Sequence, residues 1–193
     1  YKTNFLKYID YLVQSVEILC RNYGKIGGFW FDGMWDKPNE DWQEDRIYAT
    51  IRKYQPEAMI INNTGLNALG QTGHIEIDSV TFERGKPAFV DTSKKPIAGE
   101  VCDALTDHWG YAKYDICIKS PKDLVETLVD CRKYGCNLLL NSGLKGNGEM
   151  SAGERFAFEQ IGMWIRLNKN FIYDVKSTDL LADNADVMFD GEY

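Results

Sequence analysis

The stretch Gly27-Gly28-Phe29-Trp30-Phe31-Asp32-Gly33-Met34-Trp35 is an apolar, aromatic run that ends in a carboxylate followed by glycine. Consecutive apolar residues bounded by glycines are typical of a strand covered on both faces, as in a parallel sheet with helices outside it. Because an unpaired carboxylate inside such a strand is costly to desolvate, we expect Asp32 at the strand's carboxyl end. The run therefore predicts a buried strand over 28–32 that delivers Asp32 to a site. The alternative is an aspartate that only caps the next segment.

The neighbours of Asp32 suit a binding pocket. Gly33 allows the chain to turn directly after the carboxylate, and Trp30 and Trp35 are placed to wall a pocket for the apolar face of a sugar ring. In α/β barrels the catalytic groups gather at the carboxyl ends of the strands. Asp32 is thus the first candidate for a catalytic residue, and the two tryptophans are candidate binding residues.

The composition is that of an ordinary globular protein, with 193 residues, 44% of them hydrophobic and 26% charged. A net charge of −7 and a pI near 4.9 argue against nucleic acid or an anionic membrane as a partner, because both select a basic surface. A neutral or polar small molecule is the expected partner. No run of about 18 apolar residues is present, so we expect no membrane span. The start, Tyr1-Lys2-Thr3-Asn4, is not a signal peptide, and a secreted, periplasmic or cytoplasmic location stays open.

Cysteine and histidine give little support for a metal site. The five cysteines lack a Cys-x-x-Cys spacing and four stand among apolar residues, which predicts small buried hydrophobes rather than disulfides or metal ligands. With only His74 and His108, a histidine-rich site or a Ser-His-Asp triad is poorly supplied, and we expect no metal and no cofactor. His108, next to Trp109, is expected to wall a pocket or to form hydrogen bonds.

Predicted strands and helices alternate along the chain. Two helices are expected over 4–23 and 41–54, and two more begin after the capping residues Ser120 and Ser151. The helix after Ser151 is expected to turn Phe156 and Ile161 toward the core. The expected strands cover 28–32, 58–63, 97–102 and 137–141. The glycine-rich segment 64–95 is too long for a plain connector and is predicted to be an active-site loop. The alternation predicts an α/β fold with a parallel sheet and four strand–helix units, half of an eightfold barrel.

An ordered set of short motifs resembles the retaining α-L-fucosidases of glycoside hydrolase family 29. The matching segments are Tyr23-Gly24, Phe29-Trp30-Phe31-Asp32-Gly33, 51–56, Ile60-Ile61-Asn62-Asn63, Trp109-Gly110-Tyr111, 135–141, 161–164 and Ile172-Tyr173. The resemblance covers nearly the whole chain. It implies that residues 1–170 form the second half of a (β/α)8 TIM-like catalytic barrel, and that 171–193 are a linker and the start of a C-terminal β-sandwich.

The resemblance also implies a reaction, the release of terminal α-L-fucose from glycans or glycoconjugates by a retaining double displacement. The family's nucleophile falls on Asp32, and its acid/base falls first on Glu83, in Thr81-Phe82-Glu83, and second on Glu100. Retaining glycosidases hold the two carboxyl groups about 5–5.5 Å apart. The nucleophile must stay charged, so a tyrosine hydroxyl, an indole N–H or a backbone N–H is expected to donate to Asp32.

The expected substrate-binding residues are Trp30, Trp35, His108, Trp109 and Tyr111. Simpler interpretations stay open for several candidates. Glu83 is alternatively a solvated loop acid paired with Arg84, and Glu100 a strand-end residue that braces the site without proton transfer. Trp109 and Tyr111 are alternatively core aromatics.

Two departures from the family pattern concern the substrate. Thr64 stands where many members have an arginine that contacts the sugar, and Asn141-Ser142-Gly143-Leu144 stands where the family usually has Asn-Ile-Gly-Pro. The family's N-terminal histidines and aromatics would lie before Tyr1, so the missing N-terminal half of the barrel is an expected partner. The alternatives are a non-catalytic carbohydrate-binding or scaffold remnant of this fold, and a hydrolase of a related deoxysugar or galactose-like glycoside.

Overall fold

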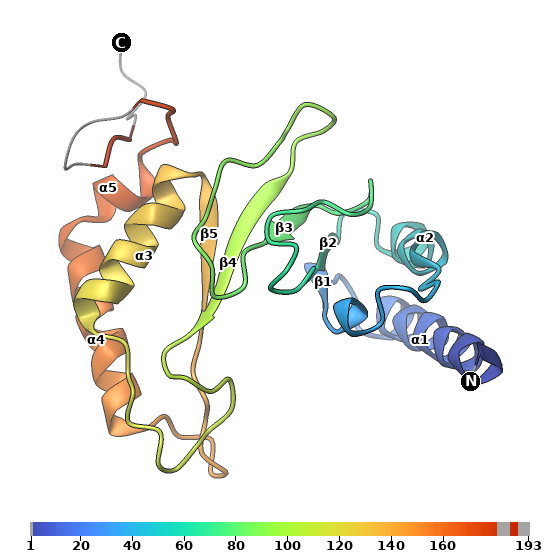
Figure 1. Cartoon of the computed structure of the whole chain (residues 1–193), viewed down its shortest axis with the longest axis horizontal. Helices are drawn as coiled ribbons and strands as arrows, with labels where there is room; N and C mark the ends of the chain where they lie inside the picture. Colours follow the sequence, from blue (N-terminus) through green and yellow to red (C-terminus); the bar gives the residue numbers. More distant parts are fainter. Residues whose placement is uncertain (1, 181–185, 189–193) are drawn as a thin grey trace. The chain divides into compact units, whose positions relative to one another are not determined.

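The computed structural model describes residues 2–180 and 186–188, which belong to two compact units. The first unit comprises Tyr1–Thr81 and Lys95–Ile97, and the second comprises Phe82–Lys94 and Ala98–Tyr193. Figure 1 shows the helices and strands of both. Each unit is an arrangement of parallel strands with helices beside them, so the predicted α/β class is confirmed.

The first unit contains α1 (Lys2–Asn22), β1 (Gly28–Phe31), α2 (Glu44–Tyr54), β2 (Met59–Asn62) and β3 (Ser79–Thr81), with a 3-10 turn η1 (Met34–Asp36) after β1. β1 pairs in parallel with β2, with Phe29 opposite Ile60, and β2 pairs in parallel with β3. The first unit therefore aligns the carboxyl ends of three strands.

The core of the first unit lies between its helices and one face of its strands. α1 buries Ile9, Val13, Val16 and Cys20, which recur at helical spacing, against Ile47 and Ile51 of α2 and Ile60 of β2. The predicted helices over 4–23 and 41–54 are confirmed within a few residues. α2 begins later than predicted because Gln43, the residue before it, has a left-handed backbone with φ of 49°.

The prediction that β1 is covered on both faces is wrong. Phe29 and Phe31 are half-buried against the core, whereas Gly28 and Trp30 are exposed. Side chains alternate between the two faces of a strand, and the helices of the first unit cover only one of them. An apolar run indicates strand structure well, but it did not distinguish one covered face from two.

The second unit contains β4 (Ala98–Ala104), α3 (Pro121–Lys133), β5 (Cys136–Asn141), α4 (Ala152–Leu167) and α5 (Lys169–Tyr173). β4 and β5 are parallel and in register from Gly99 opposite Cys136 to Ala104 opposite Asn141. Figure 1 shows α3 beside β5, and α4 packs against α3. A cluster of buried residues there contains Leu105, Leu124, Ala157 and Ile161.

Both predicted helix caps are present. The Ser120 hydroxyl accepts from the N–H of Asp123, whose carboxylate accepts from the N–H of Ser120, and Pro121 is the first helical residue. The Ser151 hydroxyl likewise accepts from the N–H of Glu154. The inward placement of Phe156 is wrong, because the buried stripe of α4 runs through Ala157 and Ile161 and leaves Phe156 56% exposed.

The segment 64–95 is not a single loop, because it contains the short, fully buried strand β3. Three residues with two hydroxyl side chains are too short and too polar for the apolar pattern to identify. The predicted boundary at residue 171 falls inside α5. Residues 181–185 and 189–193 of the expected β-rich stretch lie outside the described residues.

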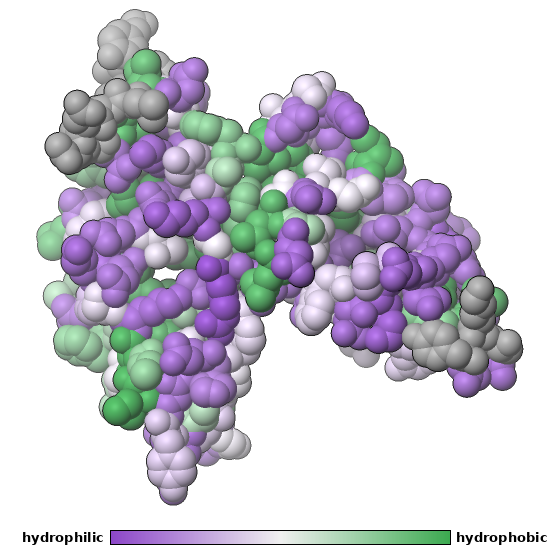
Figure 2. Space-filling model, viewed as in Figure 1, coloured by the Kyte–Doolittle hydropathy of each residue, from purple (hydrophilic) through white to green (hydrophobic). Residues whose placement is uncertain are grey.

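Polar side chains dominate the visible surface of α1 and α2, as Figure 2 shows in purple. In the described part of the chain, no helix combines the length and the apolar character needed to span a membrane. Cys20, Cys102, Cys131 and Cys136 are buried thiols, as predicted, and Cys117 is exposed.

Candidate active site

Asp32 is the first residue after β1, so its predicted place at the carboxyl end of a strand is confirmed. Its carboxylate accepts three hydrogen bonds on the same oxygen, Oδ1. The donors are the Gly33 N–H at 2.8 Å, the Trp35 indole N–H at 2.8 Å and the Asn63 side-chain amide at 3.2 Å. An indole and a backbone donor were expected here, and none of these three bonds uses Oδ2.

Two glycines allow the indole to reach Asp32. Gly33 has φ of 87°, a conformation that turns the chain from β1 directly into η1 and brings Trp35 back over the carboxylate. Gly65 has φ of 79°, and a Cβ there would lie 2.9 Å from Cγ of Trp35. The tryptophan ring therefore rests on the backbone of the loop that follows β2.

Asn63 connects the ends of three strands in the first unit. It follows β2, is only 2% exposed, and its Oδ1 accepts from the Thr81 hydroxyl at 3.0 Å and from the Gly65 N–H at 3.2 Å. With its oxygen facing two donors, the amide nitrogen is directed to Asp32. Asn63 thus holds the backbone of the loop after β2, and its bond to Asp32 was not predicted from the sequence.

Trp30 and Trp35 both remain accessible, at 38% and 49% exposed. Trp30 and Asp32 are two positions apart, and side chains two positions apart in a strand point to the same face. Both therefore lie on the face of β1 that is turned away from the helices. The first unit thus brings together Asp32, Trp35 and Asn63 at the strand ends and places Trp30 on the same face.

Two other acids of segment 64–95 serve an ion-pair network. Arg52 donates from Nε to Glu76 at 2.8 Å and from Nη2 to Asp78 at 2.7 Å, and Asp78 also accepts from the Ile60 N–H at 2.9 Å. Burial raises the pKa of Asp78, but the hydrogen bonds from Arg52 and Ile60 outweigh it and hold that pKa below its usual value. These acids brace β2 and α2.

In the second unit, Glu83 lies in a tight turn that runs beside β4. The N–H of Phe82 donates to the carbonyl of Glu100 at 2.8 Å and the N–H of Arg84 to that of Cys102 at 2.9 Å. The Gly85 N–H donates back to the Phe82 carbonyl at 3.3 Å, which closes the turn. Glu83 is half-buried at its second position.

Glu100 does not lie at a strand end, so the position given by its alternative interpretation is wrong. It is the third residue of β4, 8% exposed, and its Oε2 accepts from the Asn137 side-chain amide of β5 at 3.2 Å. Glu100 lies four positions before Ala104, the last residue of β4, or about 13 Å at strand spacing. The predicted strand over 97–102 ends two residues before β4 does, at Ala104.

The aromatic loop 107–111 is exposed, so the interpretation of Trp109 and Tyr111 as core residues is wrong; they are 41% and 45% exposed. The Arg84 guanidinium lies over the Trp109 ring at 4.6 Å and donates to the Asp107 carbonyl at 3.1 Å. His108 forms the expected hydrogen bond, from Nδ1 to Asp115 at 2.7 Å.

The loop after β5 fixes this aromatic loop. The Asn141 side-chain amide donates to the Trp109 carbonyl at 2.6 Å, and Gly143 lies so close that a Cβ there would be 2.5 Å from the Gly110 carbonyl carbon. Gly143 is itself held because its N–H donates to the buried Glu154 carboxylate at the start of α4.

One group of side chains has the composition of a metal site. Ligand atoms of Asp107, Asp115 and Cys117 lie within 4.8 Å of one another. The Asp115 oxygens, however, already accept from His108 and from the Cys117 N–H, and the nearby Asp107 charge raises the pKa of the Cys117 thiol. These contacts fold the loop, and we assign no metal to it.

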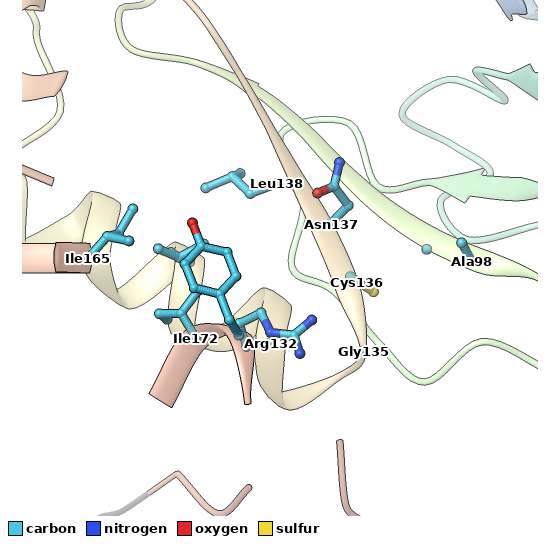
Figure 3. A pocket seen from close by; sticks show the side chains of 11 residues that line it. Ala98, Arg132, Gly135, Cys136, Asn137, Leu138, Ile165 and Ile172 are labelled. Atoms are coloured by element: carbon cyan, nitrogen blue, oxygen red, sulfur yellow. The ribbon is translucent and has the colours of Figure 1, made fainter. Parts of the chain in front are cut away.

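Figure 3 shows a pocket of about 470 Å³ in the second unit. It is lined by the first residues of β4 and β5, including Ala98 and Asn137, and by helical residues including Arg132 and Ile165. Arg132 donates from Nη2 to the Val175 carbonyl at 2.8 Å. The pocket lies at the amino ends of its strands, and none of the candidate catalytic or binding residues lines it.

A family model described as α-L-fucosidase matches residues 1–170. The chain is similar to α-L-fucosidase isoenzyme 1 from Paenibacillus thiaminolyticus, with 30% identity, a TM-score of 0.80, and coverage of 93% of this chain and 44% of that one.

Two further structures are similar. One is an α-L-fucosidase from Vibrio sp. strain EJY3, with 26% identity, a TM-score of 0.69, and coverage of 91% of this chain and 30% of that one. The other is the α-L-fucosidase AlfC from Lactobacillus casei in complex with α-L-fucose, with 26% identity, a TM-score of 0.62, and coverage of 81% and 45%. The chain therefore spans less than half the length of each of these proteins.

Proposed function

Because the chain belongs to the α-L-fucosidase family, we propose that the protein carrying it releases terminal α-L-fucose from glycans or glycoconjugates by a retaining double displacement. The observation that carries this proposal is the environment of Asp32, a carboxylate at a strand end with three donors on one oxygen. Such donors stabilise a carboxylate and fix its orientation.

In the proposed mechanism Asp32 is the nucleophile. The bonds from Gly33, Trp35 and Asn63 hold Oδ1, so Oδ2 is the oxygen that attacks the anomeric carbon as the glycosidic bond breaks. The resulting fucosyl ester is then hydrolysed by water, which restores the carboxylate and gives net retention.

Glu83 is the proposed general acid/base. It stands in Thr81-Phe82-Glu83, the segment that best matches the sequence around the family's acid/base. Glu83 would donate its proton to the leaving oxygen in the first step and accept one from water in the second. Glu100 is the second choice, because it is buried within β4 and held by Asn137.

The aromatic residues Trp30, Trp35, Trp109 and Tyr111, with His108, are the proposed binding residues for the fucosylated substrate. Thr64 does not take over the role of the arginine usual at its position, because its hydroxyl donates to the Ala68 carbonyl at 2.6 Å. We further propose that residues 1–170 are completed to a (β/α)8 barrel by an N-terminal half, and that 171–193 lead into a β-sandwich.

The test is covalent trapping with 2-deoxy-2-fluoro-fucosyl fluoride, followed by intact and peptide mass spectrometry of the intact gene product. The expected result is one added fluorofucosyl group on the peptide that contains Asp32, and its loss in Asp32→Gly. A folded protein that takes no label and releases no fucose contradicts the proposal in favour of a non-catalytic carbohydrate-binding protein. Release from other aryl glycosides only would indicate a different deoxysugar or a galactose-like substrate.

A further inference from the structure

The residue after Glu83 has an unusual backbone conformation. Glu83 and Arg84 are the two central residues of the turn closed by Phe82 and Gly85, and Arg84 has φ of 49°. Glycine or asparagine is the usual residue at a turn position with positive φ. A larger residue persists there only where its surroundings hold it in place.

Two contacts of the Arg84 side chain hold the residue in this backbone conformation. Its guanidinium lies over the Trp109 ring, with Cζ 4.6 Å from the ring centre, and Nη2 donates to the Asp107 carbonyl at 3.1 Å. Stacking and a directed hydrogen bond together use the planar geometry of arginine, which lysine lacks. Arg84 therefore attaches the turn to the aromatic loop 107–111 at two points.

The loop to which Arg84 is attached is itself firmly anchored. Asn141 holds the Trp109 carbonyl at 2.6 Å, and the backbone of Gly143 packs directly on that of Gly110. Gly143 and Ser142 both donate to the buried Glu154 carboxylate at the first turn of α4. A continuous set of contacts thus runs from α4 through two loops to Arg84.

We propose that Arg84 is a positioning residue for Glu83, which fixes the acid/base carboxyl by clamping its turn to the Trp109 loop. The inference rests on the proposed function, in which Glu83 is the acid/base. Loss of the clamp would let the Glu83 carboxyl move relative to the leaving oxygen, and a misplacement near 1 Å costs on the order of 100-fold in rate.

General acid assistance gives the inference a specific kinetic signature. Protonation matters most for a basic leaving group such as methoxide and least for 4-nitrophenoxide, which departs readily as an anion. The ratio of kcat/KM for 4-nitrophenyl and methyl α-L-fucopyranoside therefore reports how well Glu83 is placed. A general loss of folded protein changes both values equally and leaves the ratio unchanged.

The experiment compares the wild type with Arg84→Gly and Arg84→Lys in the intact gene product. Glycine suits the positive φ, so Arg84→Gly keeps the turn and removes only the clamp. We expect kcat/KM for methyl α-L-fucopyranoside to fall by about 100-fold and that for the nitrophenyl substrate by no more than about 3-fold. Arg84→Lys is expected to lie between the wild type and Arg84→Gly, because it keeps the charge without the planar stacking.

Arg155→Ala, which removes an exposed arginine of α4, is the matched control, and Glu83→Ala sets the full size of the signature. If Glu83→Ala changes the ratio of the two kcat/KM values strongly and Arg84→Gly leaves it unchanged, the inference about Arg84 is wrong and the proposed function stands. Equal losses on both substrates in the Arg84 variants overturn the inference as well. A wild type that releases no fucose overturns the proposed function and this inference with it.

Discussion

The side-chain amide of Asn63 donates to Oδ1 of Asp32 over 3.2 Å, while its own oxygen accepts from Thr81 and Gly65. Because a flipped amide would place nitrogen against two donors, the orientation of Asn63 is determined by its surroundings. Asn63, which follows β2, thereby holds the carboxylate at the end of β1, and Thr81 of β3 in turn holds Asn63.

Asn63→Ala removes the amide and leaves the Thr81 hydroxyl and the Gly65 N–H without their acceptor. Loss of one preorganised donor to a charged group is expected to lower kcat/KM for α-L-fucosides by about 100-fold. Steady-state kinetics on the intact gene product provide the measurement. Asn39→Ala, in the exposed loop before α2, is the control, and equal activity of the two variants would contradict a role for Asn63.

Trp35→Phe tests the indole donor separately from the ring. Phenylalanine retains an aromatic ring to rest on Gly65 but has no N–H for Asp32. Loss of one preorganised donor to a reacting charge is expected to lower kcat by about 100-fold. The melting temperature should change little, because Trp35 is half-exposed and phenylalanine keeps the ring. Trp164→Phe on α4 is the control. A large loss of thermal stability with unchanged kcat would assign Trp35 to packing instead.

Gly143→Ala tests the contact between the loops after β4 and β5. The added Cβ would lie 2.5 Å from the Gly110 carbonyl carbon and from the Tyr111 nitrogen, so the loops must separate. Forcing an extra group into a packed contact costs about 1–3 kcal/mol, which urea denaturation measures as a lower midpoint. Gly146→Ala is the matched control, because a Cβ there meets nothing within 4 Å. Equal urea midpoints for the two variants would show that the loops accommodate the added Cβ of Gly143→Ala without loss of stability.

The Arg52–Asp78 pair predicts a pH-dependent contribution to stability. The folded pKa of Asp78 lies below its unfolded value of about 3.9, so the group stabilises the fold above that pH. The contribution is lost as the pH falls through the folded pKa. Urea denaturation of wild type and Asp78→Asn should therefore give a free-energy difference that is constant between pH 7 and 5 and shrinks toward pH 3.

Asp179→Asn, at an exposed acid near the end of the described chain, is the control for the pH series. A difference between wild type and Asp78→Asn that is as large at pH 3 as at pH 7 would show that the Asp78 interaction does not depend on its charge.

Local signals predicted the elements well. The hydroxyl caps at Ser120 and Ser151 identify two helix starts, and an aspartate directly after an apolar run identifies the end of β1. These features depend on neighbouring residues only. β3 escaped prediction because it is short and its burial comes from contacts with distant residues.

The candidate site was predicted in part for the same reason. The indole and backbone donors to Asp32 lie within three residues of it, whereas Asn63 is 31 residues away. The place of Arg84 over Trp109 likewise depends on how two loops meet, which no local pattern encodes. Glu100 was misplaced because strand ends are difficult to locate where acidic residues continue a strand.

The two Asn63 contacts, with Asp32 and with Thr81, join residues 31 and 18 positions apart, so neither of them can form before β1, β2 and β3 have docked in their native alignment. A slip of β2 by one residue would turn Asn63 to the opposite face and leave Asp32 without its amide donor. Because long-range pairings form late, catalytic competence is expected to return only in the last phase of refolding, after helical signal has recovered. Enzyme activity then serves as a sensitive reporter of correct assembly.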